Sequence, residues 1–272
     1  MKFNLSSNGP RTSIKQVKAF CHRIILILLI LIAITFYAYL YFHYTTPILM
    51  YHSFDESKTK NFAAVSKDNF YKQMKFIKEK GYKVIPLNDY CCMLKDENPV
   101  PRNLVVITID DGYKDNLEAI KILKDFNFPA TLFVTINRIG KPEFLTDGDI
   151  RSILKETRIT IGSHTMTHPE LWKLSDAQLK NEISDSKYSL ERQFKTKVET
   201  IAYPGGAYDE RTLREIKNAN YLCACTTNRG SSKKIDLFSL RRIKATEHDT
   251  NFSLWAKLSG FYNVFKKPKK PH

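Results

Sequence analysis

The sequence predicts an α/β fold built from parallel βαβ units and preceded by one membrane-spanning helix. Short apolar stretches alternate with helical patterns along residues 47–262, without a repeat or a long linker. This alternation is typical of a parallel sheet whose crossover connections are helices. About seven units suit a barrel better than an open sheet, and in barrels the reactive residues collect at the carboxyl ends of the strands.

The uncharged stretch at residues 24–42 is long enough to cross a bilayer, which takes roughly 20 apolar residues. Its end is rich in tyrosine, as is common at a membrane interface. Residues 1–23 hold five basic and no acidic side chains, which predicts a cytoplasmic N-terminus and an extracytoplasmic segment 45–272. We interpret 24–42 as an uncleaved, single-pass anchor in the plasma (inner) membrane. A cleaved signal sequence is the alternative.

Local patterns predict each element after the anchor. A strand at 47–51 precedes a helix at 66–81, in which Phe70, Met74 and Ile77 recur at helical spacing. Further strands are expected at 82–87, 104–110, 129–135, 159–163, 199–204, 221–227 and 238–243. Further helices are expected at 116–126, 147–156, 175–194, 209–220 and 251–262, with a loop at 95–103.

The chain is basic, with a net charge of +15, and +10 remains without residues 1–23. Part of the excess is the tail KKPKKPH at 266–272, which is expected to be attracted to an anionic surface such as lipid headgroups or acidic wall polymer. No nucleic-acid-binding motif is recognisable, and a domain held outside the membrane is not expected to meet nucleic acid.

The five cysteines lack the CxxC pairs that are typical of zinc sites. Cys91 and Cys92 are adjacent, and Cys223 and Cys225 would share one face of a strand. We interpret all of them as core or adventitious cysteines. A disulfide outside the membrane is the alternative, and the sequence does not give its connectivity.

Two adjacent carboxylates, Asp110 and Asp111, end the continuous apolar strand at 104–110, and Gly112 then allows a sharp turn. Like charges side by side repel unless a positive group lies near them. A divalent metal would bind one carboxylate and keep the other ionised as a base. Taken alone, the motif also fits a turn or a helix cap.

Three other strand ends carry polar groups. His164 and His168 are spaced so that one turn of helix would bring both rings to one side, which favours a ligand pair over two isolated histidines. The stretch AYPGG at 202–206 offers backbone N–H donors for an oxyanion, or is a plain turn. His52 follows the first strand and is able to act as a general acid.

With these motifs in this order, the sequence resembles the polysaccharide deacetylase family, the NodB-homology enzymes of carbohydrate esterase family 4, over residues 47–262. TIDDGYKDN is similar to the first family motif, SHTMTH to the second and AYPGG to the third. PILMYH, FPATLFV and TIAYPGGAYDE look most like the branch that deacetylates poly-N-acetylglucosamine. The resemblance implies a distorted (β/α)7 barrel at 45–265 and metal-dependent N-deacetylation.

The resemblance also implies roles for single residues. Asp111, His164 and His168 would bind the metal, commonly Zn²⁺, with Co²⁺, Ni²⁺ or Fe²⁺ as alternatives. Asp110 would be the base that deprotonates the attacking water. The N–H of Gly205 would stabilise the tetrahedral oxyanion.

The sequence departs from the wider family in its third, fourth and fifth motifs. Ala202 replaces the arginine of the third motif, so another residue must orient Asp110, and Arg242 is the candidate. The fourth motif is not recognisable, and the Leu-x-His of the fifth is missing. In the poly-N-acetylglucosamine branch an N-terminal Tyr-His supplies that histidine, so His52 is the expected acid and His248 ranks second.

The expected function is removal of acetyl groups from N-acetylglucosamine units of an extracellular or cell-envelope polysaccharide by a membrane-anchored enzyme. A polysaccharide synthase or export partner would fit this role. One alternative is a peptidoglycan, oligosaccharide or ester deacetylase that uses the same site. Another is a non-catalytic glycan-binding protein on the same fold, which the altered third to fifth motifs would allow.

Overall fold

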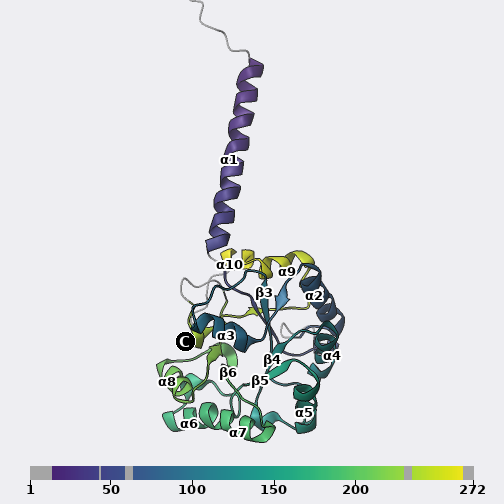
Figure 1. Ribbon diagram of the computed structural model, residues 1–272, viewed down its shortest axis with the longest axis vertical. Helices are drawn as coiled ribbons and strands as arrows, with labels where there is room; N and C mark the ends of the chain where they lie inside the picture. Colours follow the sequence, from purple (N-terminus) through teal and green to yellow (C-terminus); the bar gives the residue numbers. More distant parts are fainter. Residues whose placement is uncertain (1–13, 43, 59–63, 230–234, 266–272) are drawn as a thin grey trace, which may run out of the picture. The chain divides into compact units, whose positions relative to one another are not determined.

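The computed structural model describes residues 14–42, 44–58, 64–229 and 235–265 (Figure 1). The chain forms two compact units, Met1–Phe42 and His43–His272. The expected basic tail at 266–272 lies outside the described residues, as do the first 13 residues of the basic N-terminal segment.

The first unit contains one long helix, α1 (Ile14–Phe42). Its segment Val17–Phe42 is long and apolar enough to cross a membrane. The large apolar side chains along this segment are exposed, as Leu28 and Leu31 illustrate at 52% and 53%. A helix of this kind near the N-terminus serves as a membrane anchor or as a signal sequence.

The second unit is built on a curled sheet whose paired strands run parallel. The strands are β1 (Ile48–Tyr51), β2 (Lys83–Val84), β3 (Leu104–Ile109), β4 (Ala130–Val134), β5 (Ile159–Ser163), β6 (Thr200–Ala202), β7 (Cys223–Cys225) and β8 (Ile243–Lys244). Their order is β7-β6-β5-β4-β3-β1-β8, and β2 pairs with β3 outside this path. The end of β7 bridges to Leu240, just before β8. This arrangement confirms the predicted distorted (β/α)7 barrel.

Helices surround the sheet of the second unit (Figure 1). They are α2 (Lys67–Glu79), α3 (Leu87–Lys95), α4 (Asn116–Phe126), α5 (Asp147–Glu156), α6 (Asp176–Lys180), α7 (Ser186–Phe194), α8 (Glu210–Asn218), α9 (Asn251–Leu258) and α10 (Phe261–Phe265). Strand β3 is buried on both faces, as its unbroken apolar sequence predicts. Val105 and Ile107 pack into the larger core cluster, whereas Leu104 and Val106 pack into a smaller one.

Three local predictions were wrong. The strand expected at 82–87 is two residues long, because Pro86 starts α3, whose Leu87, Tyr90 and Cys91 are buried at helical spacing. The strand expected at 238–243 is mostly a 3-10 turn and loop that precede β8. The last helix is split in two at Gly260, whose φ of 83° is left-handed.

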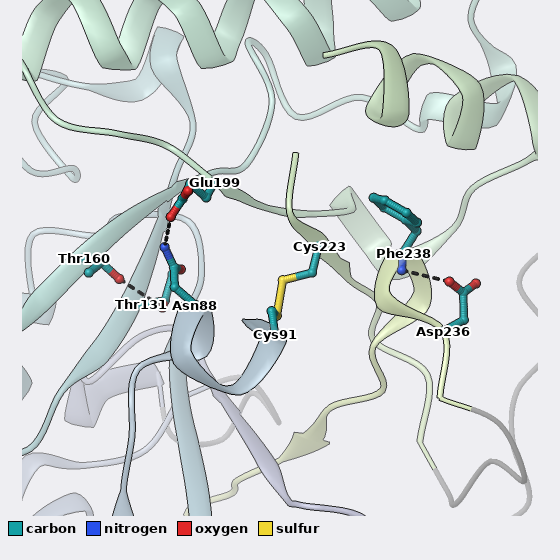
Figure 2. The surroundings of a disulfide bond; sticks show 8 residues. All are labelled: Asn88, Cys91, Thr131, Thr160, Glu199, Cys223, Asp236 and Phe238. Carbon is teal, nitrogen blue, oxygen red and sulfur yellow. Dashed lines mark hydrogen bonds between the residues drawn. A yellow bond between two sulfur atoms is a disulfide. The ribbon is translucent and has the colours of Figure 1, made fainter. Parts of the chain in front are cut away.

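A disulfide joins Cys91 of α3 to Cys223 of β7, 132 residues apart in the sequence (Figure 2). This corrects the interpretation of these two residues as unpaired core cysteines, although both are buried. Asn88 of the same helix donates a hydrogen bond to Glu199, which precedes β6, at 2.7 Å. Disulfides persist in oxidising compartments, so this bond suits a domain outside the cytoplasm.

Replacing both Cys91 and Cys223 by alanine is expected to lower the free energy of unfolding by about 2–4 kcal/mol, because the bond restricts the unfolded chain over a long loop. Urea denaturation under non-reducing conditions measures this loss. Cys92→Ala is the matched control, since Cys92 is the exposed neighbour in the same helix and is not disulfide-bonded. Equal stability of the double variant and this control would contradict the prediction.

Candidate functional site

The carboxyl end of β3 carries Asp110 and Asp111. The Asp110 N–H continues the sheet by donating to the Tyr51 carbonyl at 2.9 Å. Asp111 then takes a left-handed φ of 74° and Gly112 one of 72°, which turns the chain sharply. A non-glycine residue in this region costs about 1–3 kcal/mol, and such strain concentrates at functional sites. The turn directs two neighbouring carboxylates to different surroundings.

Asp110 is buried and forms a two-pronged ion pair with Arg242. The Arg242 Nη1 and Nη2 atoms donate to the two Asp110 carboxylate oxygens at 2.6 and 2.7 Å. Arg242 lies just before β8, is itself fully buried, and also donates to the Thr226 carbonyl and to Thr108 Oγ1. Because these bonds fix the guanidinium, the plane of the Asp110 carboxylate is fixed as well.

The charges around Asp110 keep it ionised. Burial raises the pKa of Asp110, but the Arg242 guanidinium and the imidazoles of His52 and His164 outweigh burial and lower that pKa to about 2. A buried carboxylate that stays ionised and is held by one partner can accept a proton in a fixed direction.

His52 follows β1 and lies beside Asp110. Its Nε2 is 3.8 Å from Asp110 Oδ2, and its backbone carbonyl accepts a hydrogen bond from Asn116 at 2.7 Å. Burial lowers the pKa of His52, against the opposing influence of the charges of Asp110 and Asp111. Its buried Nδ1 has no hydrogen-bond partner among the described residues. The ring therefore offers a proton-carrying group next to the carboxylate.

Asp111 meets His164 and His168, which follow β5. One ligand atom from each of the three side chains lies within 4.8 Å of the other two. Asp111 Oδ1 is 3.8 Å from His164 Nε2 and 3.5 Å from His168 Nε2. The Ala202 carbonyl lies 2.8 Å from His164 Nδ1, so a proton on Nδ1 leaves the Nε2 lone pair facing Asp111.

The chemistry of this cluster fits a metal ion such as zinc. Burial lowers the pKa of His164 and of His168, which favours the neutral imidazoles that metals bind. Two imidazoles and one carboxylate are a common set of protein ligands for catalytic zinc. The two rings meet edge to face with centroids 4.8 Å apart, and both Nε2 atoms approach the same oxygen of Asp111.

A buried glutamate holds the loop that carries the second histidine. Glu182 accepts hydrogen bonds from the Met166 and Thr167 N–H groups at 2.9 and 2.8 Å and from the Thr167 hydroxyl at 2.7 Å. Within this loop Thr165 and His168 take left-handed φ values of 67° and 69°. Glu182 lies in a π-helical segment, Asn181–Asp185, between α6 and α7. Such segments are frequent at functional sites.

Arg138 follows β4 and forms an ion pair with Asp111. Its Nη1 donates to Asp111 Oδ1 at 2.7 Å, the same oxygen that faces the two histidines. The guanidinium also lies over the Phe144 ring at 5.3 Å, and Phe144 stacks on Tyr113 at 5.2 Å. The Arg138 side chain is 26% exposed. A partly exposed cation thus borders the candidate metal site.

The remaining two candidates from the sequence are Gly205 and His248. Gly205 follows β6, whose last residue is the Ala202 that contacts His164, and takes a left-handed φ of 64°. Its carbonyl accepts a hydrogen bond from the Thr227 hydroxyl at 3.0 Å. His248 is exposed in the turn before α9. The histidine that the structure places beside Asp110 is His52.

The structure brings most of the predicted site residues together at the carboxyl ends of β1, β3 and β5, with Arg242 reaching in from the start of β8. Sequence reasoning missed Arg138 and Glu182. Arg138 follows an apolar strand within TINRIG, so its place after a strand end was a usable signal. Glu182 lies within a long amphipathic pattern at 175–194, and no local feature separates it from solvent-facing glutamates.

Comparisons with known proteins give relatives for this chain. A family model described as polysaccharide deacetylase matches residues 97–224. The Bacillus subtilis protein named "Putative polysaccharide deacetylase YxkH" is 33% identical over 202 residues, which cover 74% of this chain and 71% of that protein. A poly-beta-1,6-N-acetyl-D-glucosamine N-deacetylase of Staphylococcus aureus is 27% identical over 180 residues, which cover 61% of this chain and 62% of that protein.

Solved structures share the fold. The Streptococcus pyogenes deacetylase PplD, in complex with acetate, superposes with a TM-score of 0.73 at 29% identity and covers 78% of this chain and 97% of its own. IcaB from Ammonifex degensii superposes with a TM-score of 0.70 at 18% identity and covers 79% of this chain and 97% of its own. At 18% identity, the similarity to IcaB concerns the fold alone.

Proposed function

This chain belongs to the polysaccharide deacetylase family, hydrolases that act on carbon–nitrogen bonds, and on that premise we propose that it removes acetyl groups from N-acetylglucosamine units of an envelope or extracellular polysaccharide. The observation that carries the proposal is one buried carboxylate, Asp110, fixed by Arg242 beside a separate cluster of Asp111, His164 and His168. The S. aureus relative, named for poly-beta-1,6-N-acetyl-D-glucosamine, supports this choice of sugar.

Asp111, His164 and His168 would hold the divalent metal, with Zn²⁺ as the first choice from their chemistry. When bound, the metal would polarise the acetamide carbonyl and lower the pKa of water. Asp110 would take the proton of the attacking water, because its carboxylate is ionised and is held in a fixed orientation by Arg242.

The other site residues would complete the reaction. The Gly205 N–H would donate to the oxygen of the attacked carbonyl, where negative charge develops. His52 would protonate the departing amine, since its Nε2 lies 3.8 Å from the base and the charges of Asp110 and Asp111 oppose the lowering of its pKa by burial. The products are acetate and a free amine, so the glycan would become cationic. Arg242 would act as a positioning residue for Asp110.

The proposed enzyme is anchored in the plasma membrane through α1, with its N-terminus in the cytoplasm and the barrel outside. The basic residues before the apolar stretch support this orientation. The Cys91–Cys223 disulfide supports an oxidising compartment for the barrel.

Acetate release by the detergent-solubilised full chain tests the function. The substrates are β-1,6-linked N-acetylglucosamine oligomers, β-1,4-linked oligomers and peptidoglycan fragments, each after chelation and again with zinc or cobalt added. Metal-dependent release that is fastest from the β-1,6 oligomers is the expected result. Faster release from either other substrate would replace the proposed glycan, and no release from any of them would overturn the assignment.

Replacing Arg138 by glutamine is expected to tighten zinc binding about fivefold, the effect of removing a partly exposed cation worth about 1 kcal/mol from Asp111. Titration against a chelating indicator measures the affinity without any turnover. His164→Ala is the opposing control and should weaken binding, because it removes a ligand. Weaker binding in Arg138→Gln would show instead that Arg138 holds Asp111 in its binding position.

A further inference from the structure

Three aromatic rings form a patch on α9 and α10. Phe252, Trp255 and Phe261 contact one another, with ring centroids 5.6 to 6.4 Å apart. Phe252 is 67% and Trp255 40% exposed. We call these three residues the aromatic patch. The opposite side of α9 is fixed to the barrel, because Leu254 and Leu258 are buried in its core. The patch therefore faces outward on a rigid support.

The patch lies close to the point where the chain enters the barrel. The turn between α9 and α10 contains Gly260, and a Cβ atom added there would lie 3.4 Å from the Tyr44 ring. The Tyr44 hydroxyl donates to the Arg102 carbonyl at 2.5 Å, which fixes this first aromatic residue of the second unit. The entry point and the α9–α10 turn are thus packed together.

Chain connectivity then limits how far the patch can lie from a bilayer. Tyr44 is two residues beyond Phe42, where α1 ends, and two residues span at most about 7 Å. If α1 crosses a membrane, Tyr44 and the turn at Gly260 must lie near the headgroups. On this basis we propose that the aromatic patch docks on the outer surface of the bilayer that α1 crosses. The inference rests on the proposed membrane anchor.

The chemistry of this face fits lipid headgroups. Tryptophan and other aromatic side chains favour the interface between acyl chains and water. Cations lie near the entry point: the Arg102 guanidinium lies over the Tyr44 ring at 5.6 Å, and Arg229 and Arg241 line a small pocket together with Thr45. Four lysines follow α10 in the sequence. Such charges attract anionic lipids.

A sugar-binding role for the patch is disfavoured by its distance from the reaction. The chain enters the barrel at the amino end of β1, whereas His52 follows its carboxyl end, and the four residues of the strand at about 3.3 Å each separate these ends by about 13 Å. Docking would therefore hold the catalytic mouth above the membrane, at the height of a glycan that extends from the surface.

Fluorescence quenching in vesicles tests the proposal with the full chain. Trp172 and Trp255 are the two tryptophans. The Trp172 carbonyl accepts a hydrogen bond from Arg211 of α8, and α8 lies apart from α9 and α10 in Figure 1. Trp172→Phe leaves Trp255 as the reporter, and Trp255→Phe leaves Trp172. Both variants are reconstituted into phosphatidylcholine–phosphatidylglycerol vesicles whose acyl chains carry bromine near the headgroup.

The expected result is that Trp255 loses most of its fluorescence to the brominated lipid, whereas Trp172 keeps its own. Phe252→Ser, added to the Trp172→Phe chain, should restore part of the Trp255 signal. Tyr188→Ser is the matched control, since Tyr188 is a comparably exposed aromatic residue on α7 (56%) and should change nothing.

Three other outcomes would overturn the proposal. A chain that floats with the vesicles and resists carbonate extraction, but whose Trp255 is unquenched, would refute docking and leave the anchor intact. A chain that carbonate releases would refute the anchor and docking together. Quenching of Trp255 by N-acetylglucosamine oligomers rather than by lipid would assign the patch to the glycan instead.

Discussion

Replacing Asp110 by asparagine is expected to reduce kcat/KM for acetate release by about 10²–10⁴-fold, the usual contribution of a general base. The amide has nearly the same shape as the carboxylate, but it cannot accept the proton of the attacking water at neutral pH. Acetate release from N-acetylglucosamine oligomers at saturating zinc measures the effect. Activity close to that of the unchanged chain would remove Asp110 from the role of base.

The structure adds a complication to this experiment, because the substitution leaves Arg242 buried without a counter-charge. Removing one member of a buried ion pair typically costs about 3–5 kcal/mol of stability. The double variant Asp110→Asn with Arg242→Met removes the charge of both partners and should regain much of this stability. If the double variant is folded, binds zinc and is still inactive, the loss belongs to the chemistry and not to unfolding.

The sequence could predict much of the barrel and of the cluster for a simple physical reason. The ends of parallel strands meet at one edge of a sheet, so polar residues that follow the apolar runs at 104–110 and 159–163 had to come together. The interaction of Asp110 with Arg242 was expected because Ala202 stands where an arginine was needed. The structure places Arg242 there, although the strand predicted at 238–243 is mostly loop.

Other features depend on long-range packing that no local pattern reveals. The Cys91–Cys223 pair joins segments 132 residues apart, and α3 exists because its apolar side chains pack against the sheet. Glu182 became the support of the histidine loop through a π-helical segment, which turns it toward Met166 and Thr167. In each case the sequence shows a plausible residue, and the tertiary structure supplies its partner.

Arg242 carries the second large expected effect. Arg242→Met leaves the buried Asp110 carboxylate without its partner and is expected to lower the free energy of unfolding by about 3–5 kcal/mol. It should also reduce kcat/KM strongly, since the carboxylate loses its fixed orientation. Arg242→Lys retains the charge but not the two-pronged geometry. Its stability and its activity should therefore lie between those of the unchanged chain and those of Arg242→Met.

The pH profile separates positioning of Asp110 from a purely structural role of Arg242. Burial raises the pKa of Asp110, and Arg242 is the main charge that brings it down to about 2, below an unfolded value near 3.9. The stability from this pair is therefore present above about pH 4 and is lost as the pH falls toward about 2. In Arg242→Met burial prevails, so the acid limb of kcat/KM should move to higher pH. An acid limb that stays in place while stability falls would mean that Arg242 supports the fold without setting the charge of the base.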